Sequence, residues 1–135
     1  MAVRRQKSLL LILAREFSSQ LAMPTFIVDG EGNLVFYNEA AESILGRSFA
    51  EVGQLGAEEL VRTIDIANLE GEVLEPRDRA IGIALFERRP THATRRLRAM
   101  DGVWHTVEVT AFPLMTGPDE VGGVVAIFWE SGEGQ

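Results

Sequence analysis

The segment from Pro24 to Gly46, PTFIVDGEGNLVFYNEAAESILG, is the strongest constraint on the fold of this chain. Two short apolar runs, 25–28 and 34–37, flank a turn sequence that contains two glycines. This is the pattern of a β-hairpin. A helix can begin directly after the second run, with a polar N-cap at its start and a glycine at its end. The residues expected to fix these turns and caps are Asp29, Gly32, Asn38 and Gly46.

Residues 5–22 are predicted to form an amphipathic helix that ends before Pro24. Its apolar side chains recur at steps of three and four residues, and they cover a wider face than one small domain normally buries. Such a face needs a partner, which is either the sheet of its own domain or a second copy of the chain. We expect a homodimer formed by this helix and the outer face of the sheet. The candidate interface residues are Leu9, Leu10, Ile12, Leu13, Phe17, Leu21, Phe112, Val124 and Phe128.

The second half of the chain predicts one more helix and three strands. The helix is expected over residues 76–89, because Pro76 suits a helix start and Pro90 closes the segment. The strands are expected over residues 91–100, 103–114 and 121–129, where apolar residues alternate or run together between turn sequences.

The order of these elements predicts an α+β fold. We expect a five-stranded antiparallel sheet with helices on one face, preceded by the N-terminal amphipathic helix. The expected boundaries are a dimerisation helix at residues 1–22, a domain at residues 23–130 and a polar, frayed tail at residues 131–135.

Composition limits the chemistry that is open to the chain. None of the 135 residues is cysteine, which excludes disulfides, thiolate metal sites, thiol nucleophiles and cysteinyl photochemistry. The net charge of −7 argues against a nucleic-acid partner. The apolar run after Arg4-Arg5 is too short for an export signal or a membrane span. We therefore expect a cytoplasmic protein.

Four segments, in this order, resemble a PAS domain: MPTFIVDGEGNLVFYNEAAESILGRS, EPRDRA with its apolar helix, WHTVEVTAFPL and VGGVVAIFWE. The resemblance covers residues 23–130. It implies a sensory or protein-interaction module of bacterial signal transduction, usually dimeric, with a small cavity between sheet and helices. It does not identify the signalling partner or the effector domain.

By resemblance to ligand-binding PAS domains, every second side chain counted back from Pro113 faces this cavity. The expected cavity is mostly apolar and suits a small apolar ligand. Arg95 is its one charged residue; because burying an unpaired guanidinium is costly, Arg95 either lies near the mouth or meets an anion, unless it is a surface arginine. The candidate lining residues are Leu97, Arg95, Val107, Val109, Ala111, Val125, Ile127, Ile81 and Leu85.

The residues favour no cofactor. Haem-binding members of the family usually supply an axial histidine from the long helix, and residues 76–89 contain none. Flavin binding is disfavoured because Val109, Val125 and Leu97 lack the polar groups that would contact the flavin ring. A haem- or flavin-bound gas or redox sensor remains an alternative.

An enzyme is also disfavoured. His105 and Glu108 are three residues apart on a strand and point to opposite faces, so they cannot form an acid–base pair. We expect no catalytic residue and no metal site; a small enzyme built around the pocket remains an alternative.

Overall fold

The computed structural model describes residues 2–131 of the chain, with side chains from residue 9. Apart from Ser131, the expected tail lies outside the described residues. The helices are α1 (Ala2–Ser19), α2 (Glu39–Leu45), α3 (Phe49–Val52), α4 (Ala57–Thr63), the 3-10 helix η1 (Pro76–Asp78) and α5 (Ala80–Glu87). The strands are β1 (Thr25–Asp29), β2 (Leu34–Tyr37), β3 (Asp65–Ala67), β4 (Thr91–Arg98), β5 (Trp104–Gly117) and β6 (Glu120–Glu130).

The strands form one antiparallel sheet in the order β2-β1-β6-β5-β4-β3. The predicted α+β fold and N-terminal helix are confirmed, but the predicted count of five strands is wrong, because β3 adds a sixth. β3 is three residues long, too short to show an alternating pattern in the sequence. It pairs with β4, and an ion pair of 2.7 Å between Arg98 Nη2 and Asp65 Oδ2 joins the two strands.

The register between β5 and β6 decides which side chains face the helices. Val109 lies opposite Phe128 and Ala111 lies opposite Ala126. Directly opposed residues of antiparallel strands share a face. Even-numbered residues of β6 therefore lie on the inner face, together with odd-numbered residues of β5.

This register corrects two sequence-based expectations. Val125 and Ile127 lie on the outer face, not toward the cavity, whereas Val124 and Phe128 lie on the inner face, not in an outer patch. A slip of one residue exchanges the two faces of a strand. The β5–β6 hairpin contains two irregularities, on either side of Met115, and the sequence alone does not place them.

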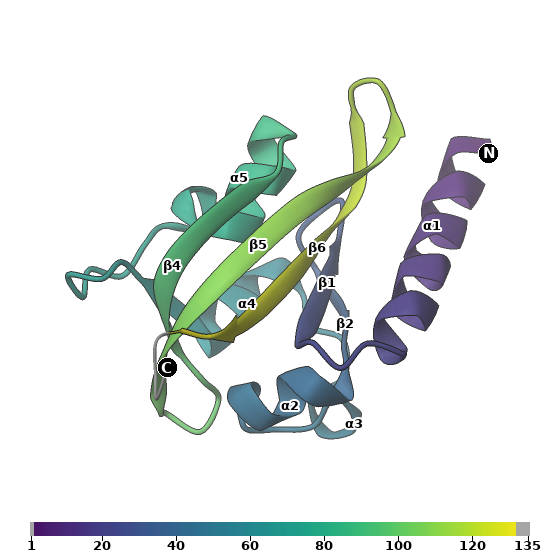
Figure 1. Cartoon of the computed structure of the whole chain (residues 1–135). Coiled ribbons are helices and arrows are strands. Elements are labelled where there is room, and N and C mark those ends of the chain that lie inside the picture. The colour runs from purple at the N-terminus through teal and green to yellow at the C-terminus, as the bar shows by residue number, and fades with distance from the viewer. Residues whose placement is uncertain (1, 132–135) are drawn as a thin grey trace.

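Helix α1 packs on the outer face of the sheet, across β6, β5, β1 and β2, whereas α4 and α5 cover the other side (Figure 1). The contact with β6 is close, because a Cβ placed on Gly123 would lie 2.8 Å from Leu11 Cδ2. The guanidinium of Arg15 lies 4.7 Å from the centre of the Phe36 ring on β2. The helix ends at Ser19 rather than at residue 22.

Asn38 joins three elements. Its Oδ1 accepts hydrogen bonds from the backbone N–H of Thr25 on β1 and of Ala41 in α2, at 3.0 and 3.1 Å. Its Nδ2 donates to the carbonyl oxygens of Ser18 and Met23, both at 2.9 Å. One buried amide therefore caps α2 and holds the end of α1 against the sheet.

The β1–β2 turn is closed by Asp29. Its carboxylate accepts hydrogen bonds from the backbone N–H of Glu31 and from both the backbone and the side chain of Asn33, between 2.9 and 3.0 Å. Gly32 in this turn and Gly46 at the end of α2 have φ of 87° and 86°, values that favour glycine.

The predicted helix over residues 76–89 forms in two pieces. η1 ends at Asp78, Arg79 is extended, and α5 begins at Ala80. Gly82 is needed at this junction, because a Cβ there would overlap the carbonyl oxygen of Pro76. The extended Arg79 turns its side chain toward the interior, as described below.

Candidate ligand-binding cavity

A cavity of about 200 Å³ lies between the inner face of the sheet and helices α4 and α5. Every strand except β2 contributes side chains to it. Its walls are almost wholly apolar. The lining residues are Phe26, Val28, Glu31, Gly32, Leu45, Ala57, Leu60, Val61, Ile64, Ile66, Pro76, Arg79, Ala80, Ile81, Gly82, Leu85, Phe86, Arg95, Leu97, Val107, Val109, Ala126 and Phe128.

Six of the nine sequence-predicted lining residues lie in this wall: Leu97, Arg95, Val107, Val109, Ile81 and Leu85. Ala111 is fully buried on the same face but lies outside the lining. Val125 and Ile127 lie on the other side of the sheet, as the register requires.

Sequence reasoning missed the contributions of α4, β1 and Arg79. Leu60, Val61 and Ile64 follow helical spacing, which could have marked α4 as part of the wall. Phe26 and Val28 are two residues apart on β1 and so share a face. The alternation rule that placed Leu97 and Arg95 of β4 in the wall would also have placed these two residues there. Arg79 gives no such signal, because its inward direction depends on the break between η1 and α5.

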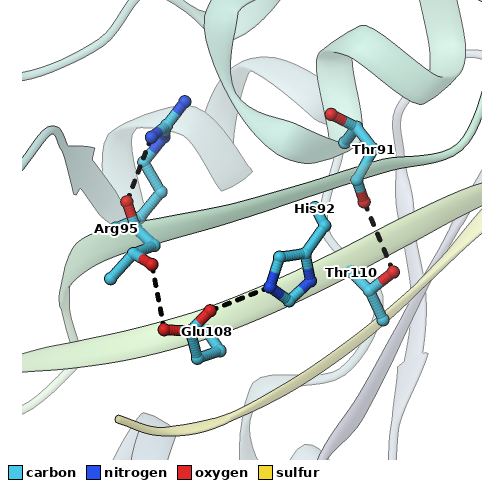
Figure 2. A network of polar contacts seen from close by, with 6 residues as sticks. Thr91, His92, Arg95, Glu108 and Thr110 are labelled. Carbon is cyan, nitrogen blue, oxygen red and sulfur yellow. Dashed lines mark hydrogen bonds and ion pairs between the residues drawn. The ribbon is translucent and has the colours of Figure 1, made fainter. Parts of the chain in front are cut away.

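Arg95 reaches the cavity from the middle of β4. Its Nη1 donates a hydrogen bond of 3.0 Å to the carbonyl oxygen of Thr94, and its Nε is buried without a hydrogen-bond partner. Figure 2 shows the guanidinium pointing away from Glu108 and His92 on the outer face. The cavity therefore contains a cationic group with an unused donor.

Arg79 is the second cation in the wall. Its Nε donates to the carbonyl oxygen of Leu74 and its Nη1 to that of Ile64, both at 3.1 Å. Burial lowers the pKa of Arg79 below its usual value, while Asp65 and Glu75 act in the opposite direction. These bonds hold the segment before η1 against the end of α4.

The two histidines lie on opposite faces of the sheet, each with a different carboxylate. On the outer face, Glu108 accepts hydrogen bonds from Thr94 and His92, both at 2.9 Å (Figure 2). The Thr94 bond, with a smaller contribution from His92, lowers the pKa of Glu108. His105 Nδ1 lies 2.7 Å from Glu130 Oε2. Neither histidine lines the cavity.

Helix α1 leaves an apolar face uncovered. Leu9, Ile12, Leu13 and Phe17 are between 55% and 68% exposed. Leu10, which was predicted to share this face, is half-buried, as is Leu21 beyond the helix. A hollow lies between this face and the β5–β6 hairpin; its residues are Leu9, Leu10, Leu13, Met115 and Thr116.

In the described part of the chain, His, Asp and Glu side chains do not gather in a group of three that could hold a metal ion. Over the same residues, no helix has both the length and the apolar character needed to cross a membrane.

The model of the family described as "PAS fold" matches residues 18–133. The chain belongs to the PAS family. No curated protein matches the sequence of this PAS domain.

Solved structures with the same fold include three PAS or LOV proteins. A LOV protein from Rhodobacter sphaeroides is 15% identical, with a TM-score of 0.69 over 92% of this chain and 68% of the other. The PAS domain of Bordetella pertussis BvgS is 15% identical, with a TM-score of 0.58 over 91% and 86%. The PAS domain of nitrogen regulation protein NR(II) from Vibrio parahaemolyticus is 17% identical, with a TM-score of 0.60 over 87% and 97%. At these identities the similarity shows the fold alone.

Proposed function

We propose that this PAS domain is a sensory module of signal transduction, in which a small, mainly apolar ligand in the cavity sets the packing of a homodimer formed through α1. The observation that carries this proposal is the arrangement on β5 and β6. Their inner face lines the cavity, and α1 packs against their outer face.

The cavity has the features of a small-molecule site. Ligand pockets are mostly apolar, with a few polar groups that orient the ligand. Here aliphatic and aromatic side chains from the sheet, α4 and α5 surround a small space, and two arginines supply the polar groups. In the described residues, no acid–base pair faces this space, which favours binding over catalysis.

The uncovered face of α1 supports the dimer. Four large apolar side chains of one helix are more than half exposed and lie within three turns of each other. A patch of this kind marks an interaction site in a soluble protein. A second α1 has the complementary apolar stripe, and a two-fold axis would bring the same residues together.

The proposed mechanism is a shift between two dimer packings. A ligand that binds better when α1 holds one position on the sheet shifts the population toward that position, by no more than its difference in affinity. Movement of β5 and β6 around the ligand would reach α1 directly, because Leu11 contacts Gly123 without a side chain between them.

Ligand binding is tested by methyl NMR of the whole chain with octanol as a neutral apolar probe. Saturable shifts are expected for the methyl groups of Ile81, Leu97 and Val109 in the cavity wall. Val73, which is 55% exposed in a loop, serves as the reference. Absence of saturable shifts in the cavity methyls would contradict the proposal.

The dimer is tested by sedimentation equilibrium. Phe17→Glu places a charge in the exposed face of α1 and is expected to weaken the dimer about tenfold or more. Leu69→Glu is the matched control, because Leu69 is 57% exposed but lies in the turn after β3. A wild-type chain that stays monomeric at high micromolar concentration would overturn this part of the proposal.

A further inference from the structure

The guanidinium of Arg95 is the least satisfied polar group in the cavity. Nη1 donates to the Thr94 carbonyl oxygen, but Nε is shielded from solvent and has no hydrogen-bond partner. Among the described residues, the ion pairs of arginine involve Arg89 and Arg98, not Arg95. A buried donor without an acceptor destabilises a fold unless a ligand supplies the acceptor.

The neighbouring arginine also has an unpaired Nε, but its guanidinium lies in a different environment. The Nε of Arg96 is buried without a hydrogen bond, and its guanidinium lies 5.5 Å from the centre of the Trp104 ring on the outer face. The ring face attracts the cation. Among the described residues, no aromatic ring faces the Arg95 guanidinium in this way, and Arg95 lines the cavity instead.

The charge of the wall favours an anion. Arg79 and Arg95 both line the cavity, and the one acidic residue among the described lining residues, Glu31, is exposed. Arg79 is already fixed by the carbonyl oxygens of Leu74 and Ile64. Arg95 is therefore the group that is free to bind, while Arg79 adds positive charge to the wall.

We propose that the ligand of this cavity is an apolar monocarboxylate, such as a medium-chain fatty acid, whose carboxylate binds Arg95. This inference rests on the proposed ligand-binding function and defines its chemical class. With Nη1 engaged by Thr94, Nε and Nη2 are the two donors left for the oxygens of one carboxylate. The hydrocarbon tail would lie along Val107, Val109 and Phe128, and it needs no polar partner there.

Calorimetric titration of the whole chain with octanoate and octanol tests this inference. The two probes share a tail and differ in the head group. We expect the wild type to bind octanoate about tenfold or more tightly than octanol, because a hydrogen-bonded charge pair contributes more than a neutral bond. Arg95→Gln should abolish this difference, while Arg96→Gln, the matched control, should retain it.

The possible outcomes distinguish a wrong ligand class from a wrong ligand-binding function. Octanoate binding that is no tighter than octanol binding, or that does not change in Arg95→Gln, would overturn the carboxylate assignment and leave the apolar ligand site standing. Failure of both probes to bind would overturn the ligand site together with the assignment. Octanol binding by Arg95→Gln also reports that the variant retains a folded cavity.

Discussion

Arg95 and Arg96 are consecutive residues of β4 whose guanidinium groups lie on opposite faces of the sheet, and each has a buried Nε without a hydrogen bond. Arg96 lies over the Trp104 ring, whereas Arg95 lines the apolar cavity. The alternation of a strand thus gives two identical side chains different roles. The guanidinium of Arg96 faces a ring of the same chain, whereas we propose that Arg95 binds a ligand.

Replacing Arg95 by an apolar residue should stabilise the protein. Arg95→Met removes the unsatisfied donor and should raise the free energy of unfolding of the ligand-free chain by about 1 kcal/mol, since a buried unpaired donor costs about 1–3 kcal/mol and Arg95 is only partly buried. Arg96→Met, which loses the contact with Trp104, should not stabilise. Urea denaturation measures both values; a stability loss in Arg95→Met would show that the arginine is satisfied without a ligand.

Asn38 should be among the residues whose loss destabilises the chain most. Asn38→Ala leaves the N–H groups of Thr25 and Ala41 without their side-chain acceptor and leaves two carbonyl oxygens at the end of α1 without their donor. We expect a loss of about 2–3 kcal/mol in unfolding free energy. Ser43→Ala, at an exposed site in α2, should change it by less than about 0.5 kcal/mol. Equal losses of unfolding free energy in the two variants would show that the hydrogen bonds of Asn38 do not contribute the expected stability.

Sequence patterns were sufficient for the parts of the fold that depend on local chemistry. Asn38 caps α2 and Gly46 ends it, as the residue types suggest. Alternation places Val107 and Val109 on one face of β5, and the resemblance to ligand-binding PAS domains assigned that face to the cavity wall, where both residues lie.

The parts that could not be predicted depend on long-range register. Val125 and Phe128 were assigned to the wrong faces of the sheet. The irregularities beside Met115 shift the register between β5 and β6, and the residue types in the hairpin do not predict the size of that shift. β3 was missed because its pairing with β4 depends on tertiary contacts, among them the Arg98–Asp65 ion pair, rather than on its own three residues.

The pKa of Glu108 should depend on Thr94. The Thr94 hydrogen bond is the largest cause of the lowered pKa of this carboxyl group, so Thr94→Val should raise the pKa toward its ordinary value. Thr106→Val, on the outer face of β5, is the control. Carboxyl-carbon NMR titration measures the shift, and an unchanged midpoint in Thr94→Val would contradict the assignment.

The lowered pKa of Glu108 also predicts how the unfolding free energy depends on pH. Because the pKa of Glu108 is lower in the folded state than in the unfolded chain, its contribution to stability is present above the unfolded value and is lost as pH falls through the folded value. Glu108→Gln should therefore reduce the acid sensitivity of the unfolding free energy. A steeper loss of stability in acid for this variant would contradict the sign.

Gly123 should control how α1 sits on the sheet. In Gly123→Ala the new methyl group would lie 2.6 Å from the Val28 carbonyl oxygen and 2.8 Å from Leu11 Cδ2, and the backbone atom cannot move aside easily. We expect a loss of about 1–3 kcal/mol in unfolding free energy, with NMR shifts spreading along α1. Gly56→Ala is the control, since its Cβ would lie 4.0 Å from Asn33 Oδ1, an ordinary contact, and its φ of −66° suits alanine. Shifts confined to Gly123 itself would show that α1 is not seated on this strand.

The coupling between the cavity and α1 is tested most directly by the dimer dissociation constant of the wild-type chain. Sedimentation equilibrium measures this constant without ligand and with octanol or octanoate at a concentration that saturates the cavity methyl shifts. The proposed mechanism predicts a change of about fivefold or more, the lower end of typical coupling between two sites. Because each dimer binds two ligands, dimerisation should change the ligand affinity of each site by the square root of that factor. A dissociation constant that does not change when the cavity is filled would contradict the account.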